Sequence, residues 1–292
     1  MGSMRGRHGD EPGRGPRSGR PSVPPIHHAE GTRLMSLTEI ANRYGTDKGT
    51  VTGHVHSYSC VYDLMLAPLR ERRLILLEVG LNIRGPVDVP SVKMWREFFP
   101  RAHIYGVDIQ DFSGFESEFF SFFRADCGDP GALEAVVNEA PQCDVIIDDG
   151  SHASYHQQLT LLKLFPLLKS GGLYIIEDLD WQPDRLEKAL PRVPKTRDLL
   201  AAFMRDGEFT RTGAIGKDDW ASLERQIENI TTFDKRSLSQ MGRFFNATHG
   251  HETASAAANG LLAKSVELAK YVCRDVNPLR RPNVKLAILQ KR

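Results

Sequence analysis

The stretch CDVIIDDGSHASYHQQ, residues 143–158, places two aspartates, a glycine, a serine and a histidine directly after a short apolar run. The apolar residues Val145 to Ile147 are typical of a buried strand. Asp148 and Asp149 follow at its carboxyl end, where like charges repel one another at short distance. Two acids and an imidazole at such a position indicate a site where a positive group binds between them.

Strands and helices alternate around this stretch, over residues 74–181. Helical patterns separate the apolar runs, and the last of these helices is expected to end at the glycine pair Gly171 and Gly172. This alternation predicts an α/β fold, a doubly wound parallel sheet with helices on both faces. The expected strands cover residues 74–80, 103–109, 122–127, 143–149 and 173–180.

The flanks of this core differ from it in composition. Residues 1–33 are rich in Gly, Pro and Arg, which predicts a disordered tail. Residues 34–73 predict a helical segment, opened by a capping-box pattern of Ser36 and Glu39. Residues 182–292 predict helical additions. Within them we expect helices over 196–207, 218–230 and 260–272, and a final edge strand over 283–292.

Composition narrows the classes of function. The chain has 38 basic and 37 acidic residues and a net charge of +1, which leaves no basic footprint for nucleic acid. No apolar run approaches the ~18 residues of a membrane helix, and the N-terminus has no apolar signal segment. The four cysteines lie far apart, as reduced thiols do. We therefore expect a cytoplasmic protein that binds neither nucleic acid nor membrane.

Every predicted strand ends in a carboxylate, and ligands of doubly wound sheets bind at these ends. Gly80 and Gly85 follow the first strand and allow a ligand to approach the backbone closely. Asp108 ends the second strand, where an acid can accept both hydroxyls of a ribose. An adenosine-type ligand follows, with NAD and S-adenosyl-L-methionine both open. The strand-end acids are Glu78, Asp108, Asp126, Asp148, Asp149, Glu177 and Asp178.

The last two strands predict a metal site. If they are neighbours, Asp149, Glu177 and Asp178 converge at one edge of the sheet. Three like charges so close need a cation, and hard carboxylate oxygens suit Mg²⁺. His152, three residues after Asp149, is expected to face whatever the metal holds.

Several ordered motifs over residues 36–180 resemble one family, the S-adenosyl-L-methionine-dependent O-methyltransferases of natural-product sugars. This family includes macrolide-sugar and rhamnose O-methyltransferases. The resemblance implies a Rossmann-like class I methyltransferase sheet with an N-terminal helical segment and C-terminal helical additions, and a homo-oligomer. The motifs are YGTDKGT (44–50), HSYSCVYDLML (56–66), LLEVG (76–80), WREFFPRAHIYGVDI (95–109), DVIIDDGSH (144–152) and YIIEDL (174–179).

The resemblance also implies roles for individual residues. Asp149, Glu177 and Asp178 match the magnesium ligands of the family, and His152 matches its general base. Together with His152, Asp149 is also expected to be a catalytic residue. The elements 45–49 and 56–58, within residues 34–73, resemble the part of the family that covers the cofactor, and residues 182–292 are expected to shape the acceptor pocket. The residues expected to contact the cofactor are Thr46, Lys48, Tyr58, Glu78, Gly80, Asp108, Asp126 and Asp148.

We therefore expect an enzyme that methylates a sugar hydroxyl of a glycoside or nucleotide sugar. Mg²⁺ would lower the pKa of that hydroxyl, and His152 would take its proton. Three alternatives stay open: an N-methyltransferase of an aminosugar or a methyltransferase of another small molecule, an NAD-dependent oxidoreductase, and a non-catalytic S-adenosyl-L-methionine-binding protein.

Overall fold

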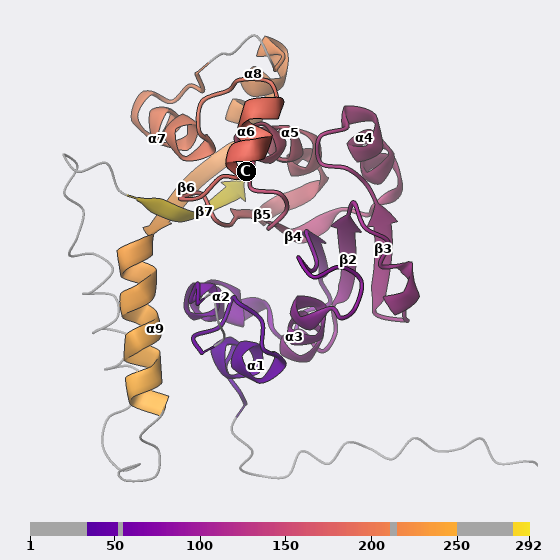
Figure 1. Ribbon diagram of the computed structural model, residues 1–292, viewed down its shortest axis with the longest axis vertical. Helices are drawn as coiled ribbons and strands as arrows, with labels where there is room; N and C mark the ends of the chain where they lie inside the picture. Colours follow the sequence, from indigo (N-terminus) through magenta and orange to yellow (C-terminus); the bar gives the residue numbers. More distant parts are fainter. Residues whose placement is uncertain (1–33, 52–54, 211–214, 250–282) are drawn as a thin grey trace, which may run out of the picture. The chain divides into compact units, whose positions relative to one another are not determined.

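The computed structural model describes residues 34–51, 55–210, 215–249 and 283–292 (Figure 1). From Met35 onward these residues belong to one compact unit. The predicted tail over 1–33 and the predicted helix over 260–272 lie outside the described residues.

The described strands form one sheet. They are β1 (Ile75–Val79), β2 (His103–Asp108), β3 (Phe120–Arg124), β4 (Cys143–Asp148), β5 (Leu168–Ile176), β6 (Ile227–Asp234) and β7 (Val284–Lys291). Their order is β3-β2-β1-β4-β5-β7-β6 (Figure 1). Strands β1 to β5 are parallel, whereas β7 runs antiparallel to both β5 and β6. The strand order reverses between β1 and β4, which is the expected position of a ligand site. The predicted α/β doubly wound sheet is confirmed.

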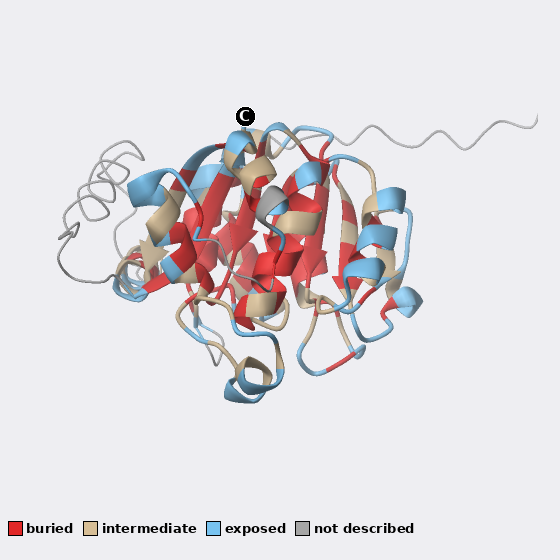
Figure 2. Ribbon diagram, turned by 90° about the horizontal axis from the view of Figure 1, so that it is seen from above, coloured by how far each residue is buried: buried red, intermediate tan, exposed pale blue. Residues whose placement is uncertain are grey.

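Helices cover both faces of the sheet. They are α1 (Leu37–Tyr44), α2 (Tyr58–Leu66), α3 (Pro90–Phe98), α4 (Pro130–Glu139), α5 (Ser154–Leu164), α6 (Asp184–Ala189), α7 (Thr196–Asp206), α8 (Lys217–Gln226) and α9 (Lys235–His249). Val145 and Ile147 of β4 pack into a core with α1, α2 and α3. Ile146, between them, packs into a second core with α4, α5, α7 and α8. A strand buried on both faces is continuously apolar, and Figure 2 shows the buried residues concentrated in the strands.

The N-terminal helix forms as its sequence predicts. Ser36 accepts a hydrogen bond from the Glu39 N–H, and the Glu39 carboxylate accepts one from the Ser36 N–H, which completes a capping box. Gly45 ends the helix in the left-handed conformation, with φ of 67°. The segment from Thr46 then leads to α2.

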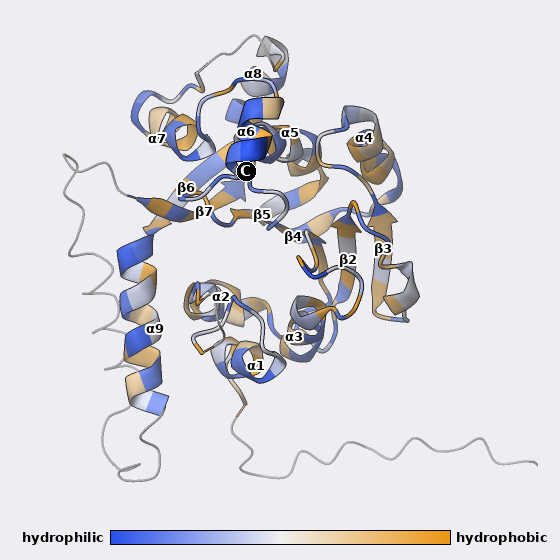
Figure 3. Cartoon of the chain, in the orientation of Figure 1, coloured by the Kyte–Doolittle hydropathy of each residue, from blue (hydrophilic) through white to orange (hydrophobic). Residues whose placement is uncertain are grey.

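Helix α9 holds that segment from the C-terminal side. It carries both hydrophobic and hydrophilic residues along its length (Figure 3), and its buried residues are Leu238, Met241 and Gly242. Asn246 exchanges hydrogen bonds with Thr50: its Oδ1 accepts from Oγ1 at 2.7 Å, and its Nδ2 donates to the backbone oxygen at 3.1 Å. A helix close to the C-terminus therefore fixes the loop between α1 and α2.

Four predicted elements were wrong in extent or place. The third strand, predicted over 122–127, is β3 and ends at Arg124. The helix expected to reach Gly172 ends near Pro166, which donates no backbone hydrogen bond, and β5 begins at Leu168. Residues 227–230, predicted as helix, belong to β6. The final strand is not an edge strand: β7 lies between β5 and β6. Its pairing with β5 and β6 covers both of its edges, and its first six residues are buried.

Among the described residues, no helix combines the length and the hydropathy that crossing a membrane requires.

A glycine-to-alanine pair tests the close contact that brings β1 and β4 together at their ends. Gly80 has φ of 84°, and a Cβ there would lie 2.1 Å from the backbone oxygen of Asp149. Gly171 has φ of 76° and nothing within 4 Å of that position. Chemical denaturation should show a loss of about 2–5 kcal/mol for Gly80→Ala, from strain plus overlap, against about 1–2 kcal/mol for Gly171→Ala. Equal losses would contradict a close backbone contact at Gly80.

Candidate active site

The carboxyl ends of β1, β4 and β5 lie side by side because β4 pairs in parallel with both neighbours. Two backbone hydrogen bonds extend this pairing past the strands. The Asp149 N–H donates to the Val79 oxygen at 2.9 Å, and the Glu177 N–H donates to the Asp148 oxygen at 3.0 Å. The acids at these ends are therefore brought to one place by the backbone.

A buried lysine from the segment between α1 and α2 lies among these acids. Lys48 is 1% exposed. Its Nζ lies 2.5 Å from Asp149 Oδ2, 2.9 Å from Glu177 Oε2 and 3.7 Å from Glu78 Oε1. The Tyr62 hydroxyl donates to Glu177 Oε1 at 2.5 Å. Between two of the acids expected to hold a metal, the protein thus places an ammonium group of its own.

Burial and charge act in opposite directions in this group. Burial and the nearby Asp149 carboxylate raise the pKa of Glu177 well above its usual value, and Lys48 opposes this shift. Burial lowers the pKa of Lys48, but Asp149 and Glu177 outweigh it and raise that pKa well above the usual value. Burial raises the pKa of Glu78 to about 7. Lys48 is therefore a permanent cation surrounded by an excess of acids.

Asp178 lies in a second group of polar side chains. Its Oδ1 accepts hydrogen bonds from the Tyr58 hydroxyl at 2.9 Å and from Lys285 Nζ at 2.5 Å. His56 Nδ1 lies 3.2 Å from the same oxygen. Burial raises the pKa of Asp178, but the adjacent His56 imidazole and the Lys285 ammonium lower it below the usual range. Asp178 is thus an ionised carboxylate.

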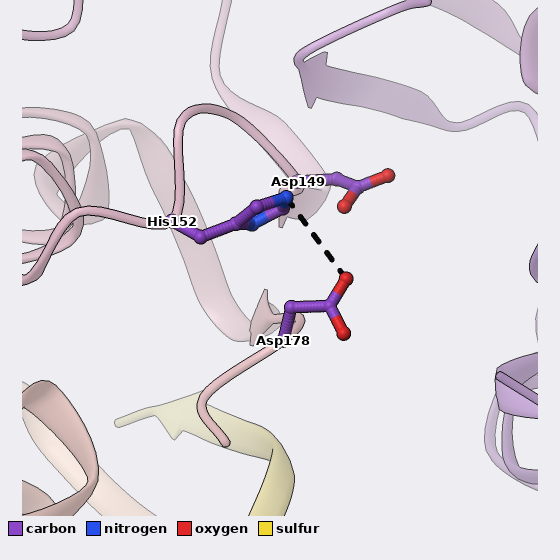
Figure 4. Close-up of side chains that lie close together, drawn as sticks. All are labelled: Asp149, His152 and Asp178. Atoms are coloured by element: carbon purple, nitrogen blue, oxygen red, sulfur yellow. Dashed lines mark ion pairs between the residues drawn. The ribbon is translucent and has the colours of Figure 1, made fainter. Parts of the chain in front are cut away.

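His152 completes the site between the two groups. Asp149, His152 and Asp178 each offer one ligand atom, and these atoms lie within 4.8 Å of one another (Figure 4). His152 Nε2 lies 3.9 Å from Asp178 Oδ2, whereas its Nδ1 is buried without a hydrogen-bond partner. Two carboxylates with a nitrogen beside them fit a divalent cation, since carboxylate oxygens are the ligands that Mg²⁺ prefers.

Glu177 occupies a different position from the other two predicted metal ligands. Its oxygens are bound by Lys48 and Tyr62, and it is not among the three residues whose ligand atoms converge. It would reach a shared ion only if Lys48 moved. The role of Glu177 as a metal ligand therefore stays a prediction.

The backbone at this site is unusual. Ser57, His152 and Asp178 have positive φ angles of 60°, 59° and 52°, a conformation that residues other than glycine rarely adopt. Each costs on the order of 1–3 kcal/mol and persists only where the surroundings hold it. His152 and Asp178 are both among these residues, which indicates that the surrounding structure fixes their side chains for a functional role.

The remaining predicted cofactor residues lie at other strand ends and in the loop before α2. Asp108, at the end of β2, accepts from the backbone N–H groups of Leu81 and Gln110, both at 2.9 Å. Asp126 follows β3 and is exposed. Burial raises the pKa of Asp148 to about 7. Thr46 is buried, and its Oγ1 accepts from the Lys48 N–H at 3.1 Å.

Sequence reasoning missed three residues that hold the site: Tyr62, His56 and Lys285. Tyr62 lies one helical turn after Tyr58, a spacing that places both hydroxyls on the same face of α2. Lys285 is a charged residue inside the apolar run of β7, and it is 6% exposed. A lone lysine in a buried strand is a signal for a buried acid, because an unpaired charge there is costly.

Comparisons with known proteins identify relatives of the chain. No protein-family model matches the sequence. The chain is 36% identical over 156 residues, 52% of its length, to an 8-demethyl-8-alpha-L-rhamnosyl tetracenomycin-C 2'-O-methyltransferase of Streptomyces olivaceus. It is 34% identical over 154 residues to a mycinamicin VI 2''-O-methyltransferase of Micromonospora griseorubida. The matched parts cover 39% and 37% of these relatives, so the chain spans less than half of their length.

Solved structures agree on the fold. A structure of MycE methyltransferase from the mycinamycin pathway, in complex with Mg, S-adenosylhomocysteine and mycinamycin VI, superposes with a TM-score of 0.56. The two sequences are 23% identical, and the matched region covers 89% of this chain and 56% of the MycE chain. A second MycE structure, with Mg and S-adenosylhomocysteine, has 27% identity and a TM-score of 0.57 and covers 70% of this chain and 53% of the other. The Rossmann-like class I methyltransferase fold is confirmed, with the N-terminal and C-terminal helices that the resemblance implied.

Replacing Lys48 tests the charge balance of the site. Lys48→Met leaves the buried Glu177 and the partly buried Asp149 without their cation, and we expect a loss of about 3–5 kcal/mol in the free energy of unfolding. The exposed ion pair of Lys93 with Asp88 provides the control, since Lys93→Met should cost no more than about 1 kcal/mol.

The Lys48→Met loss should also depend on pH. Glu78 and Glu177 have raised pKa values in the fold, so the folded state binds their protons more tightly than the unfolded state does. Their favourable contribution is present below the unfolded pKa and is lost as the pH rises through the folded pKa. Urea denaturation should show a smaller loss near about pH 5 than near about pH 8. A loss independent of pH would contradict this charge balance.

Proposed function

We propose that this chain is an S-adenosyl-L-methionine-dependent, Mg²⁺-assisted O-methyltransferase of a sugar hydroxyl, carried by a natural product or a nucleotide sugar. The observation that carries the proposal is the convergence of Asp149, His152 and Asp178 at the switch point of a class I methyltransferase sheet. The named relatives, methyltransferases of glycosylated natural products, support the same reaction class.

The cofactor would bind across the ends of β1, β2 and β3. Gly80 follows β1 beside the Asp149 backbone, Asp108 ends β2 as the ribose-binding acid, and Asp126 follows β3 near the adenine. The elements 45–49 and 56–58 would cover the cofactor, with Thr46, Lys48 and Tyr58 on them. We assign 74–181 to cofactor binding and 182–292 to the acceptor side.

The reaction needs little covalent chemistry from the protein. The acceptor oxygen attacks the methyl carbon, the carbon–sulfur bond breaks, and S-adenosylhomocysteine leaves. Asp149 and Asp178 would hold the divalent ion, which supplies a lowered pKa for a hydroxyl bound beside it. His152 Nε2 would take the hydroxyl proton, and the Asp178 carboxylate, 3.9 Å away, would stabilise the resulting imidazolium.

The cellular setting belongs to the same proposal. Cys60, Cys127 and Cys143 are free thiols, which suits a reducing, cytoplasmic environment. We also propose a homo-oligomer, as the family resemblance implies. Dependence on a metal distinguishes this proposal from the main alternative, an N-methyltransferase. An amine acceptor needs a base to accept its proton but no metal to activate it.

His152→Ala should lose turnover by about 10²–10⁴-fold, since the proton acceptor is removed. The dissociation constant for S-adenosylhomocysteine, measured by calorimetry, should stay within a factor of about three, because the cofactor lies on other strand ends. His103→Gln is the control: His103 begins β2, at the opposite end of the parallel strands, and its loss should leave turnover unchanged. Turnover near wild type in His152→Ala would exclude His152 as the base.

Removal of divalent ions tests the metal. Excess EDTA should abolish methyl transfer, and added Mg²⁺ should restore it, while S-adenosylhomocysteine binding by calorimetry continues in EDTA. Asp178→Asn should raise the Mg²⁺ concentration needed for half-maximal activity, because it removes one anionic ligand. Full activity in EDTA would remove the metal from the proposal and favour an amine acceptor.

A further inference from the structure

One exposed indole lies beside the proposed base. The chain has three tryptophans. Trp95 and Trp220 are completely buried, whereas Trp181 is 56% exposed. Its ring centroid lies 5.7 Å from that of His152, with 66° between the planes, a T-shaped contact. A large aromatic surface left open to solvent next to a catalytic group is a feature of ligand sites.

The turn that carries Trp181 is firmly held. The Trp181 N–H donates to the Asp178 oxygen at 3.1 Å, and the Leu179 N–H donates to the Lys285 oxygen at 3.0 Å. Lys285 Nζ lies 3.4 Å from Asp180 Oδ1, and Leu179 is completely buried. The turn after β5 is therefore fixed by hydrogen bonds to β7, and it holds the indole at the surface. A fixed surface binds a ligand at a lower entropic cost than a mobile one.

The flat apolar surface of the indole indicates which kind of ligand would bind there. A deoxyhexose such as rhamnose has a face of C–H groups and a methyl group, which packs well on a flat aromatic surface. Burial of that apolar area is favourable, and hydroxyls on the sugar's rim stay free to approach His152 and the two acids. Because the indole and the His152 ring are in contact, a sugar stacked on Trp181 would have its rim beside the imidazole.

We propose that Trp181 is the specificity-determining platform of the acceptor site, on which the sugar ring stacks while its reacting hydroxyl faces His152. This inference rests on the proposed function and deepens it. It predicts a preference for sugars with an apolar face, 6-deoxyhexoses above their hydroxylated counterparts.

Binding of a simple glycoside tests the platform without turnover. The probe is methyl α-L-rhamnopyranoside, added to full-length protein with Mg²⁺ and S-adenosylhomocysteine, and its affinity is measured by saturation-transfer NMR. Trp181→Ala should weaken binding about tenfold, and Trp181→Phe, which keeps a smaller aromatic face, should weaken it less. Met204→Ala, which removes another half-exposed apolar side chain on α7, should bind as wild type does.

Tryptophan fluorescence gives a second readout, because the other two indoles are buried. The glycoside should reduce acrylamide quenching in the wild type and not in Trp181→Phe. In turnover with a glycoside acceptor, Trp181→Ala should raise KM with a smaller change in kcat. The dissociation constant for S-adenosylhomocysteine should not change in any of these variants.

The outcomes separate the platform from the reaction. Equal glycoside affinity in wild type and Trp181→Ala, with S-adenosylhomocysteine bound, would overturn the platform and leave the methyltransferase proposal standing. Glycoside binding that depends on Trp181, in a protein with no affinity for S-adenosylhomocysteine, would support the platform and defeat the methyltransferase. A change of oligomeric state in Trp181→Ala with unchanged glycoside affinity would assign the indole to a subunit interface, against the proposal.

Discussion

The buried ammonium of Lys48, held between Asp149 and Glu177, is the interaction on which the arrangement of the site depends. At about 4 Å and an effective dielectric near 20, two like charges repel by about 4 kcal/mol, so acids at adjacent strand ends would otherwise separate or bind protons. Lys48 comes from the loop between α1 and α2, outside the parallel core. Its charge therefore joins the N-terminal segment to the sheet and keeps Asp149 directed toward the site.

The same principle is repeated at Asp178, where the ammonium of Lys285 supplies the positive charge and the His56 imidazole lies beside the carboxylate. The proposed ion would then lie between the two groups, beside His152, and the sugar hydroxyl would approach it from the side of Trp181.

Much of the fold follows from local sequence signals. The capping box at Ser36, the apolar runs of β1, β2 and β4 and the acids that end them all lie within short windows, and the structure has them where the patterns predict. The failures concern partners far away in the chain. Neither the pairing of β7 between β5 and β6 nor the reach of Lys48 to Asp149 has a local signal, because only tertiary packing brings those residues together. The exact ligand set is undetermined by sequence for the same reason: Glu177 and Asp178 are adjacent in the chain but face different cations.

A crystal structure with S-adenosylhomocysteine and Mn²⁺, with the ion located by its anomalous scattering, tests the central claim most directly. We predict one ion bound by oxygens of Asp149 and Asp178 at about 2.2 Å, with Lys48 still in contact with Glu177. An ion bound by Glu177 in place of Lys48 would contradict the role of the lysine as the resident cation of the site. Asp149 and Asp178 turned apart, with no ion between them, would contradict the site itself.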